Sequence, residues 1–298
     1  MRCEHPPIRK EYDEPMIEQV KNWLNEQGYP LEMRTASALR KVGFEVTQSA
    51  LYTDQETGKA REIDVLAVYP DYVGVTRIAF FVECKSLKKP WVLLCNPEVF
   101  SGHHRVYSFA AVNKNAVEAM VAEPVFKAFM DGCPWFCKDK LTGYGLRGAF
   151  TDKDIAYDAT IGFAKASIDF VNNSKDYQQS LAFPIIVITG PLIRCVLDKD
   201  GEIQLEEVTQ GEVYFKCDLA GQFGVCVKIV TLEGLPDFAR EAWQVAGFVR
   251  SQLGEAEAKL WEKEFASPYP AELKCLVDKE HQRASGETKD GASPTHSK

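Results

Sequence analysis

The sequence predicts an α/β fold in which a mixed central sheet is flanked by helices, and three observations lead to this class. Hydrophobic residues recur at helical spacing in residues 14–27 and 30–42. The segments Ile63–Tyr69 and Ile78–Lys85 are rich in β-branched and aromatic residues and are apolar on both faces, as buried central strands are. A further apolar strand, Phe183–Thr189, follows a long helical pattern. Helices and strands therefore alternate, which is typical of an α/β domain.

Glycine and proline residues mark where the first two predicted helices begin and end. The apolar pattern of Glu14–Gln27 ends at Gly28. The second helix begins near Pro30, which suits a first helical turn, and stops at Gly43. We expect a strand over 44–53 before the two central strands.

The second half of the chain has weaker patterns. We expect a helix over 113–129, a loop over 131–150, and a helix from a capping box at residues 151–154 to about Asn172. C-terminal strands are predicted at Ile193–Leu197, Ile203–Val208 and Val225–Thr231, and a last helical region, broken near Gly254, at Pro236–Phe265.

One domain is the simplest organisation of these elements. We predict a single domain over residues 1–280 with a helical insertion at about 91–150. Residues 281–298 contain Gly, Ser, Thr and charged residues without apolar periodicity, and we expect them to form a disordered tail.

Composition narrows the class of protein. The 298 residues are 45% hydrophobic and 26% charged, the balance of a soluble globular protein. The sequence has no apolar run of about 18 residues and no signal-peptide pattern, so no membrane association is expected. The nine cysteines are scattered and odd in number, which favours a reduced, cytoplasmic location. The formal net charge of −8 argues against nucleic-acid binding by bulk attraction alone, but it allows a local site.

The chemistry-bearing residues lie on the two central strands. If these strands form a hairpin folded symmetrically about their loop, Val65 faces Val82 and Asp64 faces Glu83. Lys85 lies two residues beyond Glu83, so all three polar side chains share one face. Two carboxylates this close need either a proton or a cation between them, and their oxygens suit Mg²⁺ or Mn²⁺. Lys85 would then orient a water or stabilise charge on a phosphate, and a nearby dication would lower its pKa.

These residues resemble a known family. Asp64 followed by Glu83-x-Lys85 on the next strand resembles the D…(D/E)-x-K signature of the PD-(D/E)XK (restriction-endonuclease-like) nuclease superfamily, with Ile63 in place of the Pro that members often lack. Glu32 resembles the acidic helix residue that many members add to the metal site. The order of helix, three strands, helix and strand is similar to the superfamily's α-β-β-β-α-β core. The resemblance extends over residues 14–90 and, more loosely, 151–189.

The resemblance implies a Mg²⁺- or Mn²⁺-dependent endonuclease that hydrolyses phosphodiester bonds in nucleic acid, in DNA rather than RNA. Asp64, Glu83 and Glu32 would bind the metal, and Lys85 would complete the catalytic set. A homodimer is also implied, because many relatives act as dimers. The superfamily pattern says nothing about residues 91–150.

Several alternatives remain open at this point. Lys88, Lys89 and Trp91 follow the motif and would either bind nucleic acid, through phosphate contacts and base stacking, or form a solvated turn with a packed tryptophan. The acids and lysine of the motif could instead form a structural salt-bridge cluster, and Glu32 could simply favour the first turn of its helix. A protein of the same fold could also bind nucleic acid, or act as a scaffold in DNA processing or defence, without cutting. The intact Asp, Glu and Lys set favours the enzyme.

Overall fold

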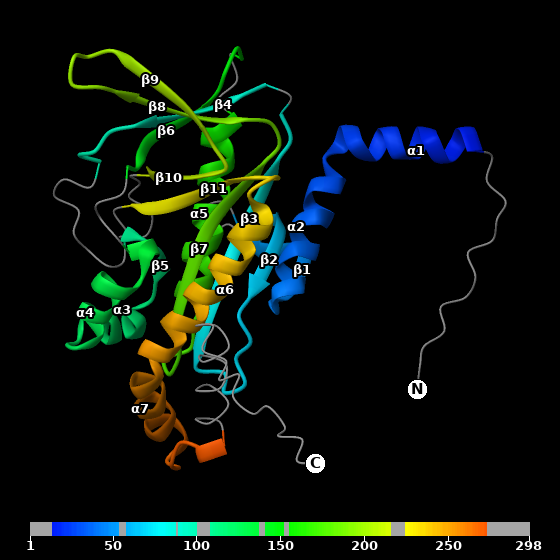
Figure 1. Cartoon of the computed structure of the whole chain (residues 1–298). Coiled ribbons are helices and arrows are strands. Elements are labelled where there is room, and N and C mark those ends of the chain that lie inside the picture. The colour runs from blue at the N-terminus through cyan, green and yellow to red at the C-terminus, as the bar shows by residue number, and fades with distance from the viewer. Residues whose placement is uncertain are drawn as a thin grey trace, which may run out of the picture.

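A computed structural model describes residues 14–53, 58–87, 89–99, 108–136, 141–151, 155–215 and 224–272 (Figure 1). Within these residues the chain is a mixed α/β protein with seven α-helices and an eleven-stranded mixed sheet. The predicted tail at 281–298 lies outside the described residues. None of the helices in the described part is long and apolar enough to cross a membrane.

The first two helices have the predicted bounds within one or two residues. Helix α1 spans Glu14–Gln27 and α2 spans Tyr29–Val42. Helix α2 ends at Gly43, whose φ of 120° lies in a region that side chains disfavour. A Cβ at this position would lie 2.8 Å from the Trp243 ring, so a glycine lets the helix end pack against that tryptophan.

The first three strands form an antiparallel meander, and the fourth strand of this half is parallel to the third. These strands are β1 (Glu45–Thr53), β2 (Ala60–Val68), β3 (Thr76–Lys85) and β7 (Gln179–Ile188). The β2–β3 pairing has the predicted register, with Val65 opposite Val82. The β3–β7 pairing is parallel along the whole of β3.

The remaining strands extend the sheet beyond β7. The full order is β1-β2-β3-β7-β11-β10-β6-β4-β8-β9, and the short β5 pairs with β7 off this path. The additional strands are β4 (Trp91–Cys95), β5 (Ala111–Val112), β6 (Gly143–Gly148), β8 (Leu192–Leu197), β9 (Ile203–Val208), β10 (Gln210–Phe215) and β11 (Val225–Thr231).

The region 91–150 differs from the prediction. The helix expected over 113–129 is two helices, α3 (Lys114–Val121) and α4 (Val125–Gly132), because Pro124 between them has no N–H with which to continue a helix. The loop expected over 131–150 contains strand β6. The segment expected as a helical insertion therefore contains helices α3 and α4 together with strands β4, β5 and β6, which join the main sheet.

Helices cover both faces of the central strands (Figure 1). Helices α2 and α6 (Leu235–Gln252) pack on the face that carries Phe80 and Phe183. Helix α5 (Ile155–Asn172) packs on the opposite face, against Phe81 and Ile186. Strand β3 is therefore buried on both sides, as its apolar sequence predicts.

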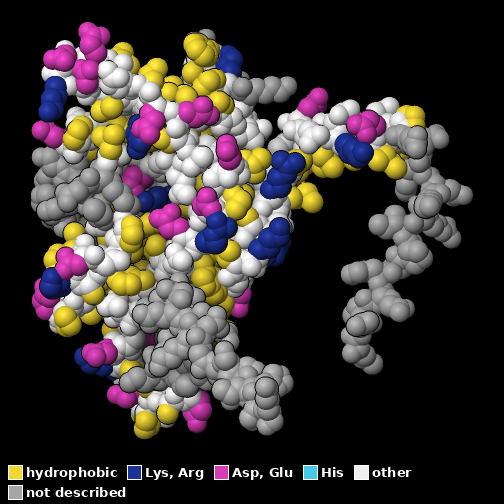
Figure 2. All heavy atoms as spheres, viewed as in Figure 1, with side chains coloured by type: hydrophobic (Ala, Val, Ile, Leu, Met, Phe, Trp, Pro, Cys, Tyr) yellow, Lys and Arg dark blue, Asp and Glu magenta, His cyan; other side chains and the backbone are white. Residues whose placement is uncertain are grey.

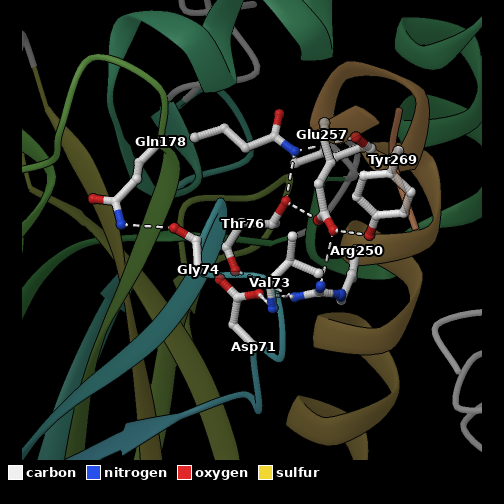
Figure 3. A network of polar contacts seen from close by, with 10 residues as sticks. Asp71, Val73, Gly74, Thr76, Gln178, Arg250, Glu257 and Tyr269 are labelled. Atoms are coloured by element: carbon white, nitrogen blue, oxygen red, sulfur yellow. Dashed lines mark hydrogen bonds and ion pairs between the residues drawn. The ribbon is translucent and has the colours of Figure 1, made fainter. Parts of the chain in front are cut away.

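A buried polar network fixes the first residue of β3 to the C-terminal helices (Figure 3). Arg250 of α6 lies 3.2 Å from Asp71 and 3.0 Å from Glu257 of α7 (Gly254–Phe265). The hydroxyl groups of Thr76 and Tyr269 both donate to the Glu257 carboxylate. Arg250 and Glu257 are almost completely buried, so the network holds β3, α6 and α7 together only while every charge keeps its partner.

Arg250→Met should destabilise the protein by about 3–5 kcal/mol, because it leaves the Glu257 carboxylate buried without its cation. Chemical denaturation measures the loss. Arg240→Met is the matched control: Arg240 forms an exposed ion pair with Asp237 on the same helix, and its loss should cost under about 1 kcal/mol. Equal effects of the two changes would show that the network does not stabilise the fold.

Candidate functional site

The candidate site lies where β2 leaves β3. The main-chain pairing of the two strands ends with the pair Val65 and Val82, and Asp64 and Glu83 would form the next pair. Beyond this pair the Asp64 side chain replaces a main-chain acceptor: its Oδ2 accepts a hydrogen bond of 2.6 Å from the Cys84 main-chain N–H. Asp64 is therefore held against β3 next to Glu83 and Lys85, as the hairpin predicts.

The backbone is distorted beside Asp64. The β1–β2 register would place Ser49 opposite Asp64, but Ser49 is unpaired in that ladder and has a φ of 54°, in the left-handed region. Ile63 and Val65 pack in the cores on opposite faces of the sheet, although regular alternation would put them on one face. Such local departures are frequent at functional sites, and this one lies beside Asp64.

Glu83 and Lys85 lie two residues apart at the C-terminal end of β3, so their side chains share one face of the strand. The Lys85 Nζ lies 2.6 Å from Glu83 Oε1, and the two side chains are 29% and 17% exposed. On β7, Glu83 lies beside Ile186 and Lys85 beside Ile188. Both isoleucines pack on the face covered by α5, so Glu83 and Lys85 share that face. The intervening Cys84 points to the other face, where its thiol lies 3.6 Å from the Thr35 hydroxyl of α2.

Glu32 contributes its charge from α2. It lies in the first turn of that helix and is partly buried. Burial raises the pKa of Glu32 to about 7, and the negative charges of Asp64, Glu62 and Glu83 act in the same direction. Lys85 opposes this shift. The structure thus brings all four predicted residues of the motif into one electrostatic cluster.

The two strand acids are also perturbed. Burial raises the pKa of Asp64, although the Cys84 hydrogen bond and Lys85 oppose the shift. Burial and the charge of Asp64 raise the pKa of Glu83. For Lys85, burial lowers the pKa, but the ion pair with Glu83 and the charge of Asp64 outweigh it, so the pKa is raised and the ammonium stays protonated at neutral pH. The cluster holds more negative than positive charge and favours a cation.

The side chains of this cluster are of the type that binds a divalent metal, but their positions in this structure do not form a complete ligand set. Carboxylate oxygens are the donors that Mg²⁺ and Mn²⁺ prefer, with waters completing the shell. Among the residues that the structure describes, no three His, Cys, Asp or Glu side chains converge on one metal position. Asp64 and Glu83 are the pair whose chemistry fits a metal, and their negative charges extend to Glu32, whose pKa they raise.

Of the three residues proposed for nucleic-acid contact, the structure describes Lys89 and Trp91. Lys88 lies outside the described residues. Lys89 is exposed, and its Nζ donates a hydrogen bond to the Phe150 carbonyl. Trp91 is completely buried in β4, so the base-stacking role is wrong for it and the packed alternative applies.

No pattern in the sequence indicates a second polar site, which lies on β10 and β11. A cavity of about 250 Å³ is lined by Trp135, Glu212, Lys228 and Glu241, among others. Lys228 forms a buried ion pair with Glu212, and the Trp135 indole donates a 2.5 Å hydrogen bond to Glu241. These residues come from distant parts of the chain without a motif, and strand β10 was not predicted.

The comparisons with known proteins identify no relative. No family model, curated protein or solved structure matches the chain.

The raised pKa of Glu32 gives a pH dependence with a definite sign. Because the folded pKa is about 7 and the ordinary value is 4.5, the folded state holds this proton more tightly, and stability falls as pH rises between the two values. In EDTA, Glu32→Gln should therefore be more stable than the native protein above pH 7 and similar to it below about pH 4.5.

Urea unfolding at a series of pH values checks this expectation. Glu26→Gln, a change at an exposed position of α1, is the control for simple loss of a negative charge. If Glu32→Gln and the native protein keep the same stability difference at every pH, Glu32 does not feel the charges of the cluster.

Proposed function

We propose that this protein is a metal-dependent nuclease of the PD-(D/E)XK (restriction-endonuclease-like) class that hydrolyses phosphodiester bonds in nucleic acid, DNA rather than RNA. One observation carries the proposal: Asp64, Glu83 and Lys85 meet at the end of a doubly buried strand, with Asp64 fixed to the main chain of Cys84 and Lys85 paired with Glu83. Burying two acids and a lysine here costs stability, and the fold offers no packing reason for it.

The chain order of the elements supports the same class. Helix α2, strands β1, β2 and β3, helix α5 and strand β7 follow one another in the order α-β-β-β-α-β, interrupted between β3 and α5. The acids of the motif lie on the second and third strands of this series, and Glu32 lies on the first helix. This is the arrangement that the sequence resemblance implies for a restriction-endonuclease-like core.

The proposed roles follow from the charges. A bound Mg²⁺ or Mn²⁺, held by Asp64 and Glu83 with Glu32 assisting, would supply positive charge for a phosphate group. Lys85 is a protonated donor in the metal-free protein, with one of its three N–H groups on Glu83. Its role is therefore to stabilise negative charge that develops on the phosphate, and to orient a water, rather than to accept a proton.

A structural ion cluster is the competing explanation, and Lys85→Met separates the two. The methionine keeps most of the stem volume and removes the ammonium. If Lys85 stabilises the transition state, cleavage should slow by about 100- to 1,000-fold while nucleic-acid affinity changes little. Plasmid, linear duplex, single-stranded DNA and RNA are incubated with each protein, with and without Mg²⁺ or Mn²⁺.

The control for this experiment is Lys127→Met, which removes an exposed lysine of α4 that is paired with Asp131. It should cleave as the native protein does. Full-rate cleavage by Lys85→Met would end the nuclease proposal, as would activity that does not follow the protein through purification. Specific binding without any cleavage would support a nucleic-acid-binding protein of the same fold.

Metal binding can be tested without any substrate. Mn²⁺ should bind the native protein, and Asp64→Asn should weaken that binding strongly, because it removes a charged ligand. Asp237→Asn, an exposed change on α6, should leave the affinity unchanged. Calorimetry that finds one Mn²⁺ affinity for all three proteins would remove the metal site from the proposal.

A further inference from the structure

Helix α1 stands away from the body of the protein with its apolar side uncovered (Figure 1). From Pro15 to Gln27 every side chain except Leu24 is exposed. Four large apolar residues of α1 and two of α2 are about half exposed or more; we call this set the elbow strip, and it comprises Met16, Ile17, Val20, Trp23, Tyr29 and Met33. Figure 2 shows apolar side chains along the underside of α1 and into its angle with α2.

The elbow strip is continuous and regular. On α1, residues 16, 17, 20 and 23 recur at the spacing of one helical face. The Trp23 and Tyr29 rings lie 5.7 Å apart and carry the strip from α1 onto α2. An isolated helix of this length is only marginally stable in water, so α1 needs a surface that covers these side chains.

The charges beside the strip indicate what that surface is. The exposed charged side chains of α1 are Glu18, Lys21 and Glu26, and Lys21 is already paired with Glu18. On α2, by contrast, Arg34 and Lys41 are exposed, and Arg40 is exposed while donating to neutral acceptors, the Val46 carbonyl and the Gln48 side chain. A mildly acidic arm beside a basic helix does not suit an anionic membrane surface, which attracts basic amphipathic helices. It does suit a second copy of this chain, because the acidic α1 of one copy can lie on the basic α2 of the other.

We infer that two copies of this chain pair through their elbow strips, with α1 of each copy lying on α2 of the other. Such an exchange is isologous, so it closes as a dimer and leaves no strip uncovered. Six half-exposed large side chains present on the order of 600 Å², and pairing two such strips buries about 1,200 Å², the lower end of the standard interface size. Gly28, with a φ of 86°, forms the bend that directs α1 away from its own body.

The dimer is tested by light scattering during size exclusion and by sedimentation equilibrium over a range of concentrations. The native protein should be a dimer. Val20→Glu on α1 and Met33→Glu on α2 should each weaken dimerisation by at least about 30-fold, because each puts a charge at an apolar contact. Met33 is 61% exposed, so its change leaves the body folded, and melting curves of both variants confirm this. Leu51→Glu, at an exposed apolar position on β1, is the control and should remain dimeric.

The other occupants give different results, and each overturns the inference. A native protein that stays monomeric while the α1 amides resist hydrogen exchange would show that the same chain covers the strip. A monomer that binds vesicles of phosphatidylcholine and phosphatidylserine would show a membrane surface. A dimer that survives both substitutions would place the interface elsewhere. None of these outcomes depends on cleavage, so the result is independent of the proposed nuclease activity.

Discussion

The hydrogen bond from the Cys84 main-chain N–H to the Asp64 carboxylate is the interaction on which the candidate site depends. Strand β3 is paired with β7 up to Lys85, but its pairing with β2 ends at Val82. A main-chain N–H at this half-covered end needs an acceptor, and the Asp64 side chain supplies one. The same bond holds Asp64 beside Glu83, so one hydrogen bond both completes the strand edge and places the acid.

The part of the site that could be predicted follows from alternation and loop symmetry. Once the two strands form a hairpin, the register that puts Val65 opposite Val82 also puts the motif residues side by side, and the structure confirms that register. Glu32 could be placed near them only through the family resemblance, because nothing in its own helix indicates which face of the sheet α2 covers. The distortion at Ser49 left no mark in the sequence, because a serine does not indicate a left-handed backbone.

Strands β6 and β10 escaped prediction for different physical reasons. Strand β6 contains Gly143 and Gly145, which do not have the alternating side chains typical of a strand. A Cβ on Gly143 would lie 2.4 Å from the Leu93 side chain, so the close approach of strand β4 requires a glycine there. Strand β10 begins with Gln210 and includes Glu212, whose burial depends on Lys228 from β11. The sequence left two roles open for Trp91 because its position after the motif says nothing about burial, and the structure places it on an inner strand within the core.

The electrostatics of the cluster link proton and metal binding. Each of the three acids has a raised pKa, so in the metal-free protein the cluster tends to take up protons as pH falls. A dication at the same place must displace those protons, and its affinity would therefore rise with pH until the acids are ionised. Lys85 does not relieve this competition, because its ammonium is already engaged by Glu83. Burial raises the pKa of Glu32 to about 7, and this residue lies on the helix whose exposed side belongs to the elbow strip. Pairing of two elbow strips would remove water from α2 near Glu32, because Met33 of the strip is the next residue. Dimerisation would therefore change the pKa of Glu32.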